Sequence, residues 1–253
     1  MSKSKVFDTE TFFEEKPFDY VEYMVDSWKS WIAEIITELE KIKSNEIKLL
    51  TYFSIIDMMA QEYFNYPDRK NQKTFTDFVL VFQNKYDFLE LVDPITLYYH
   101  VEDIVKNNVN LEELEDGSFY YPKTNIIRDK VADIRAILEP IKGVEFCDSI
   151  ESKHRYVDLL YRIRCRLSHE FSSRHTFPNE RETQPYYINC YRQYVTKGKI
   201  ISDEVWQLIY PVKFVQDLCL NCFENYLQYC LDNHVPPGKN NGMDRFCELS
   251  WYN

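Results

Sequence analysis

The stretch "LYRIRCRLSHEF", residues 160–171, sets three arginines and one histidine into an otherwise apolar helical pattern. Successive side chains of an α-helix turn by about 100° around its axis. If residues 155–171 form one helix, a single apolar stripe runs along it, made of Tyr156, Leu160, Ile163, Leu167 and Phe171. We expect this stripe to be the buried face of the helix.

The opposite face of this helix is polar. On the helical wheel Cys165 and His169 point nearly opposite the apolar stripe, and Arg162 lies close to His169. Arg164 and Ser168 fill the other flank of this outward face. Arginines at helical spacing are typical of a solvated surface, but Arg, Ser, Cys and His together also suit a groove that another molecule completes. The pattern alone leaves both interpretations open.

Glycine is scarce, with five in 253 residues, and the chain has neither a Gly/Ser linker nor an evident repeat. This composition argues against many β-turns and favours one domain that is mainly α-helical. We expect Thr74 or Thr76 to cap the third helix of the chain. Apolar residues at spacings of three and four predict helices over 20–45 and 46–67, two within 74–105, one over 123–139 and one over 211–233.

Residues 185–211 interrupt this helical pattern. The segment "PYYINCYRQYVTKGKIISDEVWQLIYP" loses the helical period and is rich in Tyr, Ile and Val around a Lys-Gly-Lys turn. It predicts a short β-hairpin between the motif helix and the last long helix.

The charge of the chain limits its partners. A net charge of −11 disfavours a broad surface that coats nucleic acid, because such surfaces need clustered Lys and Arg. Residues 154–177 are the exception, since they hold five arginines against two acidic residues. No run of about 18 apolar residues occurs, and the amino-terminal residues lack the features of a signal peptide. We therefore expect a soluble, cytoplasmic protein without a membrane partner.

The seven cysteines are an odd number and are scattered along the chain, so we expect reduced thiols. Cys219 and Cys222 form the one close pair, and no second pair stands at the spacing of a zinc site. Their aromatic, helical context favours buried packing over metal binding. We expect neither a metal nor a cofactor.

The residues from Arg164 to His169 fit the Arg-x4-6-His signature of the HEPN superfamily, a group of α-helical domains found in many prokaryotic toxin and antiphage-defence ribonucleases. Segments 47–63, 75–86 and 91–103 also resemble helices that precede this motif in small bacterial HEPN-like proteins. The resemblance implies a single HEPN-like domain over 1–253, with a helical extension (1–45), a HEPN-like core (46–233) and a carboxyl-terminal tail (234–253). One position departs from the pattern, because Cys165 stands where many active members carry Asn, Asp or His.

The resemblance implies a metal-independent endoribonuclease that leaves 2′,3′-cyclic phosphate ends, with Arg164 and His169 as catalytic residues. Such a reaction needs a base for the ribose 2′-hydroxyl, an acid for the departing 5′-oxygen and a cation for the phosphorane. Histidine suits the first two tasks and arginine the third. We expect further RNA contacts from Arg162, Arg166, Ser168 and His175.

Each chain offers one motif histidine, whereas the reaction uses a protonated and an unprotonated partner together. A two-fold homodimer supplies both, so the resemblance implies a composite site at a homodimer interface. It also implies a possible antitoxin or defence-system partner. Two alternatives stay open: a non-catalytic HEPN dimerisation or adaptor module that binds a nucleotide or a partner protein, and a helical domain in which the motif is coincidental.

Overall fold

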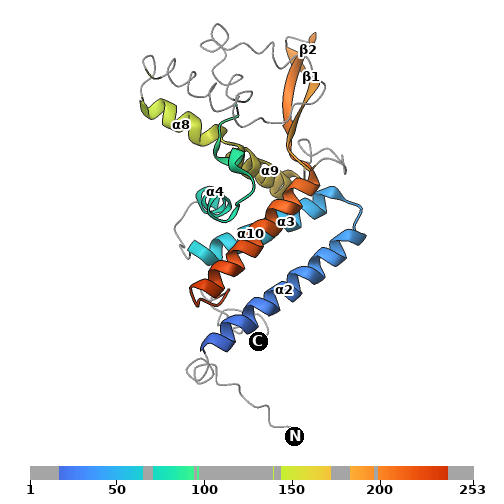
Figure 1. The fold of residues 1–253 in the computed structure, drawn as a ribbon. Coiled ribbons are helices and arrows are strands. Elements are labelled where there is room, and N and C mark those ends of the chain that lie inside the picture. Colours follow the sequence, from blue (N-terminus) through green and yellow to red (C-terminus); the bar gives the residue numbers. More distant parts are fainter. Residues whose placement is uncertain are drawn as a thin grey trace, which may run out of the picture.

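The computed structural model describes residues 17–64, 71–93, 96, 139, 144–171, 183–196 and 199–238 (Figure 1). These residues are mainly helical and include one two-stranded antiparallel sheet. The predicted mainly-α fold with a β-hairpin is therefore confirmed. Among the helices of these ranges, none combines the length and the apolar character that crossing a bilayer requires.

Apart from α8 and the 3-10 turn η1, which the sequence pattern did not predict, the described helices follow the predicted order. They are α2 (Pro17–Lys41), α3 (Asn45–Phe64), α4 (Asn71–Phe82), the 3-10 turn η1 (Asp87–Glu90), α8 (Val144–His154), α9 (Tyr156–Glu170) and α10 (Val212–Asp232). The predicted helix over 123–139 and the second helix within 74–105 lie largely outside the described residues. So does most of the tail over 234–253.

The start of α4 differs from the prediction. Thr74 and Thr76 lie inside the helix with side chains only 2% exposed, and the helix already begins at Asn71. Neither threonine is the cap, because both face the hydrophobic core instead of the end of the helix. A threonine is short enough to be buried, so its side chain gives an ambiguous signal of a helix start.

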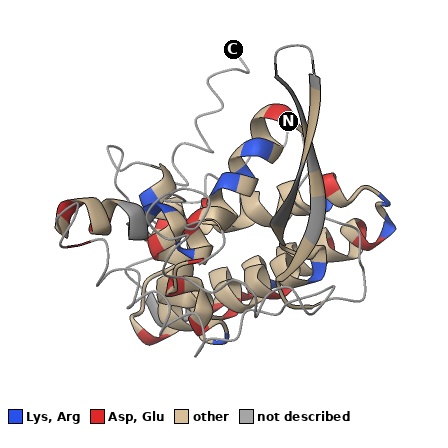
Figure 2. Cartoon of the chain, turned by 90° about the horizontal axis from the view of Figure 1, so that it is seen from above, with Lys and Arg blue, Asp and Glu red and all other residues tan. Residues whose placement is uncertain are grey.

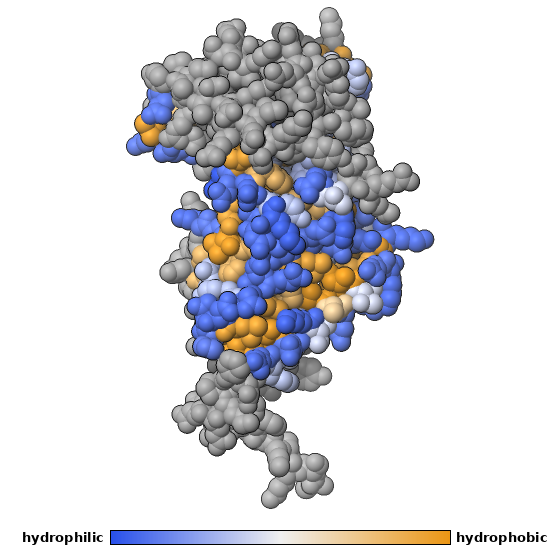
Figure 3. Space-filling view, in the orientation of Figure 1, coloured by the Kyte–Doolittle hydropathy of each residue, from blue (hydrophilic) through white to orange (hydrophobic). Residues whose placement is uncertain are grey.

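One hydrophobic core joins the helices. Figure 1 shows α3 and α10 crossing one another, with α2 alongside and α4 on the other side. Aromatic rings fill the contact between them: Phe82 of α4 lies 4.9 Å from Tyr63 of α3 and 5.5 Å from Tyr226 of α10, measured between ring centres. Figure 3 shows a diagonal band of hydrophobic residues along the line on which α2 meets α10. Helix α2 contributes Val21, Val25, Ile32 and Leu39 to the same core.

The cysteine pair of α10 lies inside this core. Cys219 and Cys222 are 1% and 0% exposed, so the predicted burial is confirmed. Burial raises the pKa of both thiols well above their ordinary value. Both cysteines are free, and their role in the described structure is packing.

The hairpin consists of β1 (Tyr186–Thr196) and β2 (Lys199–Ile209), paired in register from Tyr186 with Ile209 to Thr196 with Lys199. Figure 1 shows it extending away from the helices as an arm. The base of the arm is buried at Tyr187 and Leu208, whereas Tyr191 is 72% exposed farther along. The arm is therefore anchored at its base, where it meets the amino end of α9.

Candidate functional site

Helix α9 buries its apolar stripe as the wheel predicts, apart from the last position of the stripe. Tyr156, Leu160, Ile163 and Leu167 are buried, each 7% exposed or less. Phe171 is 57% exposed, so its predicted burial is wrong. The helix ends at Glu170, and Phe171 adopts a left-handed backbone conformation that turns its side chain off the stripe.

Arg164 is held by an ion pair across two helices. Its Nε and Nη2 both donate to Oδ2 of Asp57 on α3, each at 2.7 Å. The guanidinium carbon also lies 5.6 Å from the ring centre of Tyr161, one turn earlier on α9. Both side chains of the ion pair are only about one-fifth exposed, at 22% and 21%. The motif arginine is thus held between α3 and α9 and is only partly exposed.

The partly buried setting changes the acidities of this cluster. Burial disfavours the charged guanidinium, but the charge of Asp57, its hydrogen bond and smaller contributions from Cys165 and Tyr161 together outweigh burial, so the pKa of Arg164 is raised. Burial also raises the pKa of the Asp57 carboxyl, although Arg164 opposes this change. Burial and, next, a hydrogen bond with Cys165 raise the pKa of Tyr161 to about 12. Cys165 is thus half-buried beside Tyr161 and Arg164, and its thiol is free.

His169 lies in the last turn of α9 and is exposed. It follows Arg164 by five positions, which places the two side chains about 140° apart around the helix axis. The described structure does not join the two side chains by a hydrogen bond within one chain, and it corrects the predicted outward position of Arg164, which faces α3 and is only partly exposed. His175, the other predicted histidine, lies outside the described residues.

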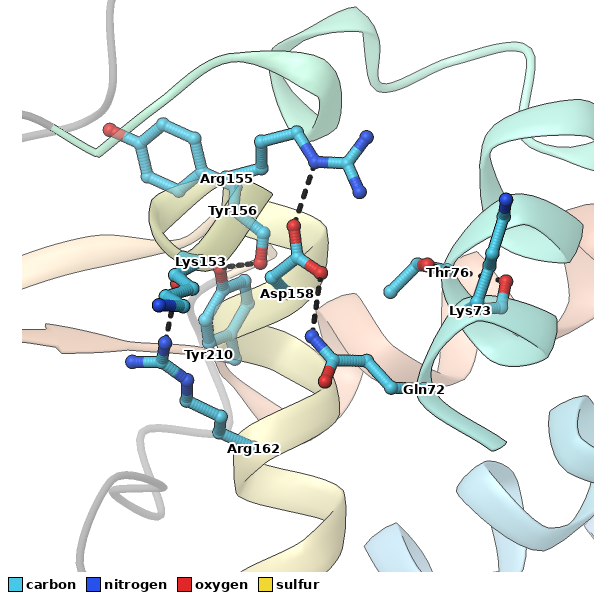
Figure 4. A network of polar contacts seen from close by, with 9 residues as sticks. All are labelled: Gln72, Lys73, Thr76, Lys153, Arg155, Tyr156, Asp158, Arg162 and Tyr210. Atoms are coloured by element: carbon cyan, nitrogen blue, oxygen red, sulfur yellow. Dashed lines mark hydrogen bonds and ion pairs between the residues drawn. The ribbon is translucent and has the colours of Figure 1, made fainter. Parts of the chain in front are cut away.

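The three remaining predicted contacts differ in their surroundings. Arg162 Nη2 donates to the Lys153 carbonyl oxygen at 2.7 Å, so it caps the carboxyl end of α8 (Figure 4). Ser168 Oγ donates to the carbonyl oxygen of Arg164 at 3.0 Å, one turn earlier in the same helix. Arg166 is exposed on the surface of α9. Arg162 and Ser168 therefore have structural contacts that the sequence pattern did not predict.

Asp57 is the residue of the site that the sequence analysis missed. It stands in the apolar run "FSIIDMMA" of α3, whose neighbours Ile56 and Met59 are fully buried. A carboxylate within such a run needs a partner, because burying an unpaired charge is costly. This isolated charge was the available signal, although the sequence does not identify Arg164 as its partner.

A second polar network holds the amino end of α9. Figure 4 shows Asp158 between Arg155 and Gln72. Its Oδ2 accepts from Arg155 Nε at 2.7 Å, and its Oδ1 accepts from Gln72 Nε2 at 3.0 Å. Asp158 is 2% exposed, so these contacts compensate a buried carboxylate and fix α9 against α4.

Charges of both signs lie on the described helices. Figure 2 shows acidic and basic residues interspersed over them. Within the described ranges, His, Cys, Asp and Glu residues form no group of three or more that could hold a metal ion.

Comparisons of the chain with protein-family models, with curated proteins and with solved structures gave no match. A functional interpretation therefore depends on the motif residues and on the contacts that α9 makes.

Proposed function

We propose that the chain is a cytoplasmic, metal-independent endoribonuclease of HEPN type that acts as a toxin or antiphage-defence effector. One observation carries the proposal. Asp57 and Tyr161 fix the guanidinium of Arg164 where α9 packs against α3, with 22% of its side chain exposed, while His169 is exposed in the last turn of α9. An oriented cation and an accessible imidazole are the two groups that metal-free RNA cleavage uses.

The chemistry follows from these two side chains. A neutral His169 accepts the proton of the ribose 2′-hydroxyl, which then attacks the adjacent phosphorus atom. A protonated His169 from a second copy donates a proton to the departing 5′-oxygen, so that a 2′,3′-cyclic phosphate remains. Arg164 donates hydrogen bonds to the phosphorane oxygens and stabilises their added charge.

A homodimer is part of this proposal, because one chain supplies only one motif histidine. The exposed face of α9 permits the approach of a second copy, and a two-fold axis beside it would bring both motifs into one cleft. Arg166 and Ser168 are then the nearest further contacts for RNA on this face. An antitoxin or defence-system protein that covers the same face would restrain the activity.

RNA cleavage in EDTA tests the proposal. The purified wild-type protein should cut RNA and leave 2′,3′-cyclic phosphate ends, and His169→Asn and Arg164→Ala should each abolish cleavage. His234→Asn is a matched control, because His234 is also exposed but follows the last helix, α10. Cleavage that survives His169→Asn would rule out the proposed chemistry.

A second candidate is a non-catalytic HEPN dimerisation or adaptor module that binds a nucleotide or a partner protein. It is favoured by the ion pair itself, because Asp57 already offsets the charge of Arg164. The acidic net charge points in the same direction. A stable dimer that cuts no RNA, and that dissociates when Arg164 is replaced by Ala, would support this candidate over the nuclease.

A further inference from the structure

We infer that Asp57 is a positioning residue that orients Arg164 for catalysis, an inference that rests on the proposed function. The two residues are 107 positions apart in the sequence and meet only because α3 packs against α9. Asp57 thereby makes α3 a part of the site, although the motif lies entirely on α9.

The geometry of the ion pair restricts the guanidinium in a specific way. Nε and Nη2 share one edge of the planar group, and both reach the same oxygen, Oδ2, at 2.7 Å. The ring of Tyr161 lies 5.6 Å from the guanidinium carbon. Two donors on one acceptor and an adjacent ring together limit rotation about the last bonds of the side chain. The N–H groups outside the ion pair are therefore presented in a defined direction.

The same ion pair also reduces the positive charge that Arg164 offers to a substrate. The Asp57 carboxylate offsets part of the positive charge that Arg164 would offer to an RNA phosphate. Asp57 therefore weakens the general attraction for RNA while it fixes the donors that the transition state needs. Orientation of this kind affects the chemical step, and misplacement of a catalytic group by about 1 Å costs roughly 100-fold in rate.

The expected signature separates positioning from simple folding. Asp57→Asn should lower kcat by roughly 10- to 100-fold, while KM for RNA stays unchanged or falls because the site becomes more positive. Asp57→Glu keeps the carboxylate and should recover part of the lost kcat. Asp26→Asn is the matched control, because Asp26 has an exposed ion pair with Lys29 on α2.

Arginine NMR signals give a readout that does not require turnover. The Nε–H resonance of Arg164, assigned with the Arg164→Lys variant, should exchange slowly with water in the wild type and in Asp26→Asn. It should exchange rapidly in Asp57→Asn. If Asp57→Asn fails to fold, kcat and the exchange rate of the Arg164 Nε–H signal are measured on Asp57→Glu instead.

Two results would overturn the inference in distinguishable ways. A folded Asp57→Asn variant with wild-type kcat, in a preparation whose wild type cuts RNA, would exclude a positioning role and leave the proposed function intact. A wild type that cuts no RNA would overturn the proposed function and this inference together, whatever the NMR signal of Arg164.

Discussion

The hydroxyl groups of Tyr156 and Tyr187 lie 2.6 Å apart and join the first residue of α9 to the second residue of β1. The Tyr187 hydroxyl donates in turn to the fully buried carboxylate of Asp93. Tyr210, directly after β2, donates its hydroxyl to the Tyr156 carbonyl oxygen at 2.7 Å. Both strands of the hairpin are thus fixed to the start of the helix that carries the motif.

Tyr187→Phe should reveal how much this network stabilises the fold. The substitution removes the donor to Asp93 and the acceptor for Tyr156 while it keeps the ring. Groups buried without a hydrogen-bond partner cost about 1–3 kcal/mol, so the free energy of unfolding in urea should fall by that amount. Tyr191→Phe, on the exposed part of β1, should change it by less than about 0.5 kcal/mol. Equal free energies of unfolding for the two variants would contradict a stabilising role of the network.

Arg162→Ala should act on stability through α8. The variant loses the hydrogen bond from Arg162 Nη2 to the Lys153 carbonyl oxygen at the carboxyl end of that helix. A cation at this end of a helix stabilises it by about 0.3–1 kcal/mol, so thermal denaturation should show a loss of this size. Lys29→Ala removes an exposed cation from the middle of α2, away from a helix end, and serves as the control. An Arg162→Ala variant with wild-type thermal stability but weaker RNA binding would instead indicate that Arg162 contacts the substrate.

Phe171 provides a test of backbone strain at the end of the motif helix. Its φ of 47° lies in the left-handed region that glycine adopts at little cost. Phe171→Gly should therefore be more stable to urea than Phe171→Ala by about 1 kcal/mol, since the two variants lose the same exposed ring. An alanine variant that matches the glycine variant would show that this conformation carries no strain.

The sequence predicts the buried face of α9 because a helix repeats every 3.6 residues, so Leu160, Ile163 and Leu167 fall on one line. The same rule fails at Phe171, because periodicity does not indicate where a helix ends. Residues 185–211 predict the hairpin through their strand-forming composition and their turn. Composition does not predict that hydroxyls from this segment reach the start of α9.

The candidate site is predictable only in part. The outward position of Arg162, Arg166 and His169 follows from the wheel and is confirmed. The ion pair between Arg164 and Asp57 depends on how α3 packs against α9, and no local pattern encodes a contact across 107 positions. An isolated aspartate in an apolar run indicates that a partner exists, but only the tertiary structure identifies it.

Alkaline pH should destabilise the protein through buried acids of the core. Burial raises the pKa of Cys230 from 9.0 to about 11 and that of Tyr52 from 10.0 to about 12. Each group keeps its proton more tightly in the folded state, so the unfolded chain releases its protons first as the pH rises. The stabilisation is complete below pH 9 and is lost progressively towards pH 11 for Cys230 and pH 12 for Tyr52.

Urea denaturation at about pH 8 and about pH 10.5 measures this effect as a fall in the free energy of unfolding. Cys230→Ala removes one of the two titrating groups. The free energy of unfolding should therefore fall less between the two pH values, even though the variant is less stable at both. Exposed Tyr23 shares the phenol but not the burial, so Tyr23→Phe should leave the difference between the two pH values unchanged. A free energy of unfolding that stays constant or increases between the two pH values would show that these groups titrate alike in the folded and unfolded chain.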